Sequence, residues 1–184
     1  MLMVKTTLAT GLLAAIAGLT ACASGPTPNA FSPDSVPDAV KVPAGHRVAL
    51  ETVGIGKITY ECRAKKDAPG QFAWEFVAPD AQLTDRTGRL IGKYFGPPAT
   101  WTNLDGSTVT GAQVSVSPGA EKSIPLQLVK ANPSTGNGAF TDVTYIQRVA
   151  TRNGVVPADT CNDLANGTRA DVTYQADYIF WKAR

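Results

Sequence analysis

The chain has 184 residues, of which 43% are hydrophobic, and its formal net charge is +2. This hydrophobic content excludes a disordered chain, because it is enough to form a core. Lys5 lies in an N-terminal segment that we expect to be removed, so the mature protein is nearly neutral. A nearly neutral domain gives no electrostatic reason to expect a nucleic-acid partner, which would require a basic surface.

The N-terminal residues have the pattern of an export signal. After Lys5, the apolar segment 8–19 has the length of a signal-peptide core and is too short to span a bilayer as a helix. It ends in Leu19-Thr20-Ala21-Cys22, which resembles the lipobox of bacterial lipoproteins. The resemblance implies a diacylglyceryl thioether on Cys22, cleavage before this cysteine and an acyl chain such as palmitate on the new amine. An ordinary signal peptide with a coincidental cysteine is the alternative.

We therefore expect three parts: a signal peptide at 1–21, an acylated cysteine with a flexible tether at 22–37, and one β domain at 38–184. Proline and small polar residues dominate the tether. The remaining segment of about 145 residues is large enough for one core. Several acyl chains on Cys22 would hold the protein stably on a membrane of the cell envelope. Ala23 follows the cysteine in place of aspartate, which in a Gram-negative host favours the outer membrane, with the domain on its periplasmic or surface face.

The domain has the alternation and the turn residues of antiparallel β-structure. The clearest strand is 171–182, where one face carries Val172, Tyr174, Ala176, Tyr178 and Phe180. Segment 100–116 is predicted to fold into a hairpin at Asp105-Gly106, and 157–165 is the one segment suited to a short helix. The other expected strands are 46–53, 57–63, 71–77 and 141–151, with a turn-rich stretch at 79–88. These features predict an all-β fold, an antiparallel β-sandwich or partly closed barrel with one short helix at most.

Two cysteines remain after Cys22, namely Cys62 and Cys161. An exported chain lives in an oxidising compartment, and two is an even number, so we expect a disulfide between them. A pair of metal-binding or redox thiols is the alternative, although the chain has no Cys-x-x-Cys motif.

Several short stretches, taken in order and spacing, resemble DUF3455, a family of uncharacterised exported proteins. They include Tyr60-Glu61-Cys62, Pro79-Asp80-Ala81-Gln82-Leu83, Gly96-Pro97, Asp105-Gly106-Ser107, Ile146-Gln147-Arg148-Val149-Ala150-Thr151 and Tyr174-Gln175-Ala176-Asp177-Tyr178-Ile179-Phe180, with Trp74, Trp101, Gly154, Pro157 and Cys161 between them. The resemblance implies an exported location and a shared fold. It implies no activity.

We expect no catalytic residue, cofactor or metal, because the chain has one histidine, His46, and none of the common catalytic or nucleotide-binding motifs. The segment 94–101 offers Tyr94, Phe95 and Trp101 among glycine and proline residues. These rings are our candidate ligand-binding residues, since aromatic faces stack on sugars or apolar molecules. Alternatively, they cap the core. A binding or structural module is the leading hypothesis, with a glycan, a small apolar ligand or an envelope protein as partner.

The second hypothesis is a carboxylate-dependent hydrolase of envelope or extracellular glycans. Two carboxylates are sufficient for glycoside hydrolysis without histidine. Glu61 and Glu75 lie on adjacent expected strands and on the same outer face, and Asp80 is nearby in sequence. Two solvated strand residues would give the same pattern. A metal site at His46 ranks third.

Overall fold

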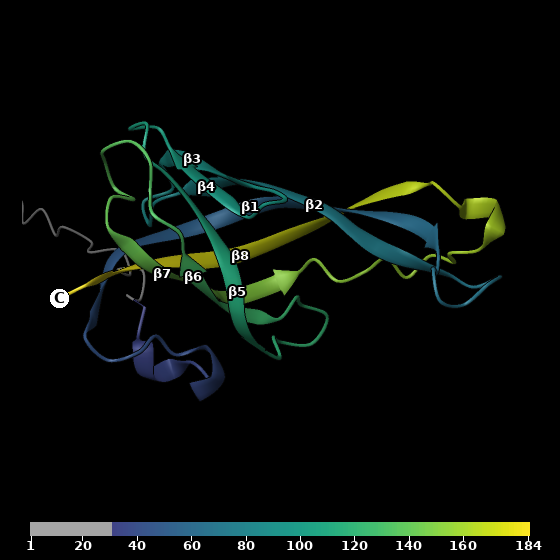
Figure 1. The fold of residues 1–184 in the computed structure, drawn as a ribbon, viewed down its shortest axis with the longest axis horizontal. Helices are drawn as coiled ribbons and strands as arrows, with labels where there is room; N and C mark the ends of the chain where they lie inside the picture. Colours follow the sequence, from purple (N-terminus) through teal and green to yellow (C-terminus); the bar gives the residue numbers. More distant parts are fainter. Residues whose placement is uncertain (1–30) are drawn as a thin grey trace, which may run out of the picture.

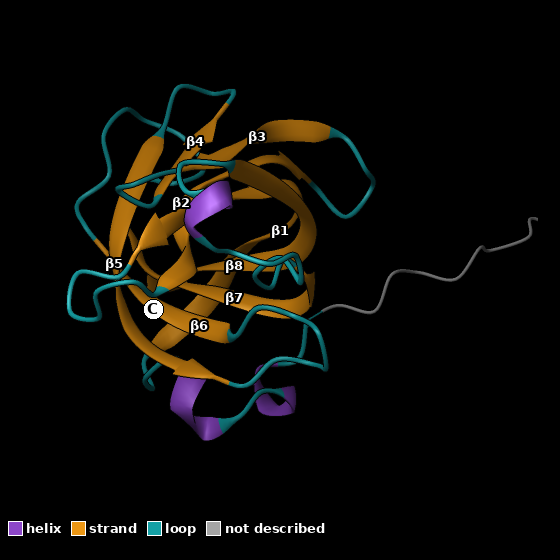
Figure 2. Cartoon of the chain, turned by 90° about the vertical axis from the view of Figure 1, so that its right-hand side faces the viewer, coloured by secondary structure: helices purple, strands orange, loops and turns teal. Residues whose placement is uncertain are grey.

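The computed structural model describes residues 31–184, in which eight strands form one antiparallel sheet that closes on itself (Figure 1; Figure 2). Each strand pairs with the next, and β1 also pairs with β8, so the sheet is an up-and-down barrel. The strands are β1 (His46–Ala64), β2 (Phe72–Thr84), β3 (Leu90–Phe95), β4 (Thr100–Asn103), β5 (Thr108–Ser117), β6 (Leu126–Ala131), β7 (Val143–Asn153) and β8 (Arg169–Ala183). The all-β prediction is confirmed, and of the two architectures the barrel is the one observed. The expected signal peptide and Cys22 lie outside the described residues.

Individual elements differ from the expected ones in three ways. The segments 46–53 and 57–63 form the single strand β1, because Gly54 and Gly56 stay extended and pair with β8. The strand β2 continues to Thr84, so Asp80 lies opposite Lys57 of β1 and not in a turn. The expected short helix is reduced to one 3-10 turn, η3 (Asp163–Ala165), and the sequence does not predict β3 or β6. Within residues 31–184, no helix is both long and apolar enough to cross a membrane.

The inward faces of the strands form one core that closes one end of the barrel. Phe140, on the loop between β6 and β7, packs on Phe180 with ring centroids 4.5 Å apart. Trp101 of β4 contacts Phe180 edge-on and is 1% exposed. The ring of Tyr178 crosses the interior opposite Gly54, where an added Cβ would lie 2.6 Å from that ring. Glycine at position 54 therefore makes room for Tyr178.

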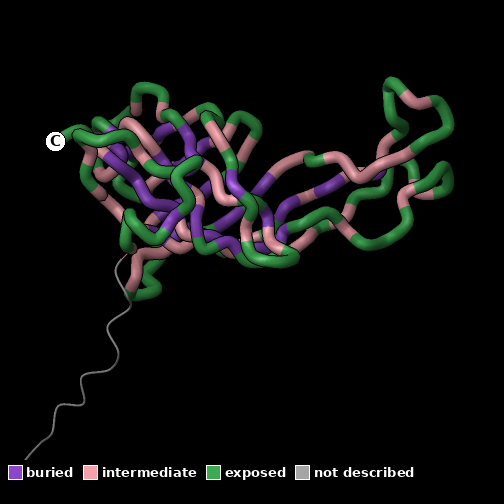
Figure 3. The backbone as a smooth tube through the Cα atoms, turned by 90° about the horizontal axis from the view of Figure 1, so that it is seen from below, coloured by how far each residue is buried: buried purple, intermediate pink, exposed green. Residues whose placement is uncertain are grey.

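At the other end, β1, β2 and β8 continue beyond the shorter strands as a projecting arm, at the right of Figure 1. In the arm, Tyr60–Ala64 pairs with Phe72–Phe76, while Thr59–Glu61 pairs with Arg169–Asp171. The expected disulfide between Cys62 and Cys161 is confirmed and lies in this arm. It ties β1 to the segment before β8. Figure 3 shows that the loops at the tip of the arm are largely exposed, whereas the buried residues concentrate in the barrel.

A strap formed by residues 31–42 packs on the outside of the barrel and contains two 3-10 turns, η1 (Pro33–Ser35) and η2 (Asp38–Val40). Val40 is completely buried, and Phe31 packs edge-on against Trp181 of β8. The strap and the outward face of β6, β7 and β8 form a second core, consisting of Val36, Val40, Leu128, Val149, Ile179 and Trp181. Residues 31–37, the end of the expected tether, are therefore part of the folded domain.

Loss of the disulfide should lower the free energy of unfolding by about 4–5 kcal/mol, because the bond closes a loop between residues 99 positions apart. The measurement is urea unfolding of the oxidised protein and of the double variant Cys62→Ser, Cys161→Ser. A reducing agent should destabilise the wild type and leave the double variant unchanged. A loss below about 1 kcal/mol would contradict this expectation.

Candidate functional site

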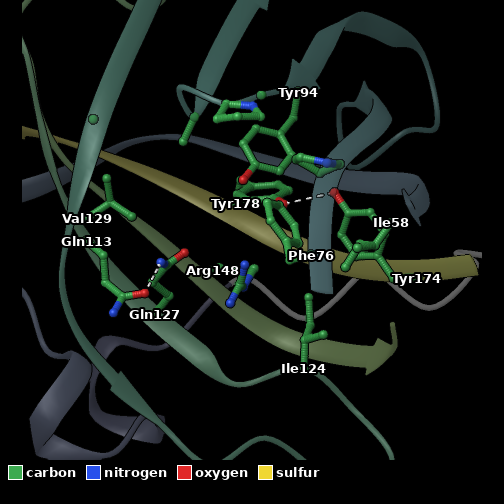
Figure 4. A pocket seen from close by; sticks show the side chains of 15 residues that line it. Ile58, Phe76, Tyr94, Gln113, Ile124, Gln127, Val129, Arg148, Tyr174 and Tyr178 are labelled. Atoms are coloured by element: carbon green, nitrogen blue, oxygen red, sulfur yellow. Dashed lines mark hydrogen bonds between the residues drawn. The ribbon is translucent and has the colours of Figure 1, made fainter. Parts of the chain in front are cut away.

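A cavity of about 320 Å³ lies inside the barrel, at the end where the arm projects (Figure 4). Ile58, Phe76 and Tyr174 line it at the base of the arm. The loop between β3 and β4 contributes Gly96, Pro97 and Ala99 to its lining. Its remaining lining residues are Pro79, Tyr94, Gly111, Gln113, Ile124, Gln127, Val129, Arg148 and Tyr178. Aliphatic and aromatic side chains share the lining with the polar groups of Gln113, Gln127, Arg148 and the tyrosines, a combination found in small-molecule sites.

Tyrosine side chains form the most buried wall of the cavity. The hydroxyls of Tyr174 and Tyr178 are hydrogen-bonded at 3.1 Å, as the dashed line in Figure 4 shows. The ring of Tyr94 lies 4.9 Å from that of Tyr178 and stacks on Trp101 at 4.7 Å. Burial raises the pKa of Tyr94, Tyr174 and Tyr178, so all three stay neutral hydroxyls at physiological pH. They can donate hydrogen bonds and carry no charge.

Of the three candidate aromatic residues, Tyr94 alone lines the cavity. Phe95 alternates to the outside of β3 and is 43% exposed. Trp101 lies behind Tyr94 as part of the core, because it pairs with Tyr94 and Val109 at an inward position of β4. Its indole N–H is buried without a hydrogen-bond partner among the described residues. Replacing Trp101 would therefore remove core packing and would be a poor test of ligand contact.

The single charged side chain in the lining is Arg148, which extends from β7 into the space between a glutamine pair and the tyrosines (Figure 4). Its Nε and Nη2 donate to the carbonyl of Pro125 at 3.2 and 3.0 Å. The glutamine pair is held by a bond of 2.6 Å from Gln127 Nε2 to Gln113 Oε1. The lining contains no carboxylate, so the cavity carries a net positive charge.

A family profile described as a protein of unknown function, DUF3455, matches residues 43–182. The chain belongs to the DUF3455 family. The match runs from just before β1 to the penultimate residue of β8, so it contains the DUF3455 barrel except for its last strand residue and includes every lining residue of the cavity. Comparisons with curated proteins and with solved structures gave no match.

The carboxylates considered for hydrolysis lie on the outer face of the DUF3455 barrel. Glu61 and Glu75 are paired with each other on β1 and β2, and they share one face, as the sequence predicts. Arg63 contacts both carboxylates, and Arg169 contacts Glu61. Hydrogen bonds from Arg63 and then Arg169 hold the pKa of Glu61 at about 2, far from that of a general acid. Asp80 is exposed and lies outside the cavity lining, so the geometry does not support the hydrolase hypothesis.

His46 lies away from the cavity, at the start of β1. Its Nδ1 lies 2.9 Å from the carbonyl of Pro43, and its ring packs edge-on against Tyr145. This is the environment of a structural histidine. In the part of the chain that the structure describes, no three His, Cys, Asp or Glu side chains are grouped so that they could hold a metal ion.

Sequence reasoning missed Arg148 as a site residue and placed Tyr174 and Tyr178 in the core. The signal for Arg148 is its position in the expected strand 141–151, two residues after the fully buried Ile146 and therefore on the same face. A charged residue on the apolar face of a strand breaks the alternation of apolar and polar residues, and such a break points to a functional site.

The ion pairs of Glu61 should make stability fall at acidic pH. Because the pKa of Glu61 is about 2 in the folded protein and 4.5 for a free glutamate side chain, its contribution is present above about pH 4.5 and is lost as the pH falls toward 2. Glu61→Gln should therefore lose less stability than the wild type between about pH 5 and pH 2. Urea unfolding at several pH values measures this, with Glu121→Gln, on an exposed loop, as the control. An unchanged pH dependence in Glu61→Gln would contradict the assignment.

Proposed function

We propose that the chain is an envelope lipoprotein whose DUF3455 barrel binds a small, largely apolar molecule. The cavity carries this proposal, because it combines aromatic and aliphatic walls with a few fixed polar groups. Eight-stranded barrels are just wide enough to fill with side chains or to hold one small ligand. Here one end is filled by Trp101, Phe140 and Phe180, and the space remains at the other end.

The anchoring half of the proposal rests on the sequence. Residues 19–22 resemble a lipobox behind a short apolar segment, and Cys22 would carry the lipid. The pairing of Cys62 with Cys161 is consistent with folding in an oxidising compartment. A barrel held at a membrane surface would meet lipids, envelope glycans and other envelope proteins, and the apolar walls favour a small apolar ligand among these.

Filling the cavity should abolish binding. The substitution Val129→Phe adds a ring at a buried lining position, whereas Val114→Phe makes the same change at an exposed position on β5 and is the matched control. With 1-decanol as the probe, we expect the melting temperature of the wild type and of Val114→Phe to rise, and that of Val129→Phe to stay constant. At a ligand concentration of 100 Kd the stabilisation is about 2.7 kcal/mol. A folded Val129→Phe that still binds, or a wild type unaffected by the probe, would contradict this proposal.

Replacing Cys22 should prevent lipid modification of the protein. In cells fed an alkyne-bearing fatty acid, the full chain should become labelled and sediment with membranes, and Cys22→Ala should not become labelled. The double variant Cys62→Ser, Cys161→Ser controls for the loss of cysteine as such and should remain labelled. Labelling of Cys22→Ala would exclude this cysteine as the attachment site.

A further inference from the structure

The guanidinium of Arg148 has hydrogen-bonding capacity that the protein does not use. A guanidinium carries five N–H donors. Two of its nitrogens, Nε and Nη2, share the carbonyl of Pro125. Nη1 has no protein acceptor within residues 31–184, and no carboxylate there lies within 4.0 Å of the guanidinium. Arg63, Arg86, Arg89 and Arg169 each contact at least one carboxylate, whereas Arg148 shares the lack of such a contact with Arg47, Arg152 and Arg184 among the described residues.

The direction of Arg148 is fixed by the residues on either side of it. Gln147 is 1% exposed and faces the strap, where it donates to the carbonyl of Val40 and accepts from the indole of Trp181. Val149 packs in the same outer cluster. Because side chains alternate along a strand, Arg148 must face the barrel interior. The contacts of Gln147 and Val149 on the outer face therefore direct the charge of Arg148 into the cavity.

The tyrosine pair supplies a second hydrogen-bond donor. Two hydroxyls that contact each other use one of their two protons in that contact, so the other proton is free for an acceptor. Burial raises the pKa of both Tyr174 and Tyr178, and the charge of Arg148 acts on both in the opposite direction. The cavity thus presents a fixed cation and neutral donors, and its lining offers no negative group.

We propose that the cavity binds an apolar molecule ending in an oxyanion, with the oxyanion on Arg148. The apolar part would lie among Ile58, Tyr94, Ile124 and Val129. A carboxylate or a phosphate fits the planar guanidinium, because each can accept two parallel hydrogen bonds from its edge. This inference rests on the proposed function and adds the chemical class of the ligand.

A series of probes with one tail and different head groups tests the inference on the purified wild-type protein. Decanoate, decyl phosphate, 1-decanol and decyltrimethylammonium share a ten-carbon chain. Titration calorimetry should show at least one of the two anions binding about tenfold more tightly than 1-decanol or better, and the cation binding more weakly than 1-decanol. The stronger of the two anions identifies the head group as carboxylate or phosphate.

Two substitutions assign the preference to the guanidinium. Arg148→Met keeps an unbranched stem and removes the guanidinium, and it should reduce anion affinity about tenfold or more, with 1-decanol affinity unchanged within about twofold. Arg152→Met makes the same change at an exposed position on the same strand and should alter neither affinity. Binding of 1-decanol to Arg148→Met shows that its cavity is intact.

The outcomes separate the two proposals. If the wild type binds 1-decanol as tightly as both anions, the inference is overturned and the apolar cavity stands. If no probe binds, both are overturned. If Arg148→Met fails to fold, Arg148→Lys takes its place, because lysine keeps the charge and loses the planar fork of the guanidinium. The role of Arg148 is then judged from this variant together with the ratio of anion affinity to cation affinity in the wild type. If the wild type binds the anions and the cation with nearly equal affinity, the proposed role of Arg148 is overturned.

Discussion

Backbone hydrogen bonds between β1 and β8 join the two ends of the sheet, from His46 opposite Ala183 to Glu61 opposite Arg169. Within the barrel this ladder leaves no free sheet edge and turns one face of every strand toward a common interior, whereas in the arm β2 and β8 each pair with β1 alone. Tyr94, Arg148 and Tyr178 come from β3, β7 and β8, far apart in the sequence, and converge because of this closure. No single stretch of the sequence therefore forms the cavity.

The strap also affects the site, because it helps to fix the register of β7. A slip of one residue in β7 would exchange its two faces. Gln147 opposes such a slip because both ends of its amide are bonded, to the carbonyl of Val40 and to the indole of Trp181, in a buried position. The outer core thus holds the charge of Arg148 in the inner cavity. The strap is a structural part of the site although it does not line it.

Strong local signals made part of the structure predictable from the sequence. The alternation in 171–182 identified β8 and its inward tyrosines, Asp105-Gly106 identified the turn after β4, and compartment chemistry identified the disulfide. β6 escaped prediction because Leu128 and Val129 are both buried, one under the strap and one in the barrel, which removes the alternation. Barrel and sandwich could not be separated, since the difference is the pairing of β1 with β8. For the same reason the site could not be assembled from sequence alone.

The environment of Arg148 also determines how affinity and selectivity would divide in this cavity. A buried ion pair often gains little in total, because removing both charges from water offsets their attraction. In this barrel Arg148 is partly buried in the free protein and its guanidinium is held by the carbonyl of Pro125, so its direction is fixed before a ligand enters. An oxyanion that enters would lose part of its own water, and hydrogen bonds between charged groups are stronger where the local dielectric is low. The aliphatic and aromatic walls would hold the tail of the ligand, and Arg148 would orient the ligand and favour an anionic head group over a neutral or cationic one.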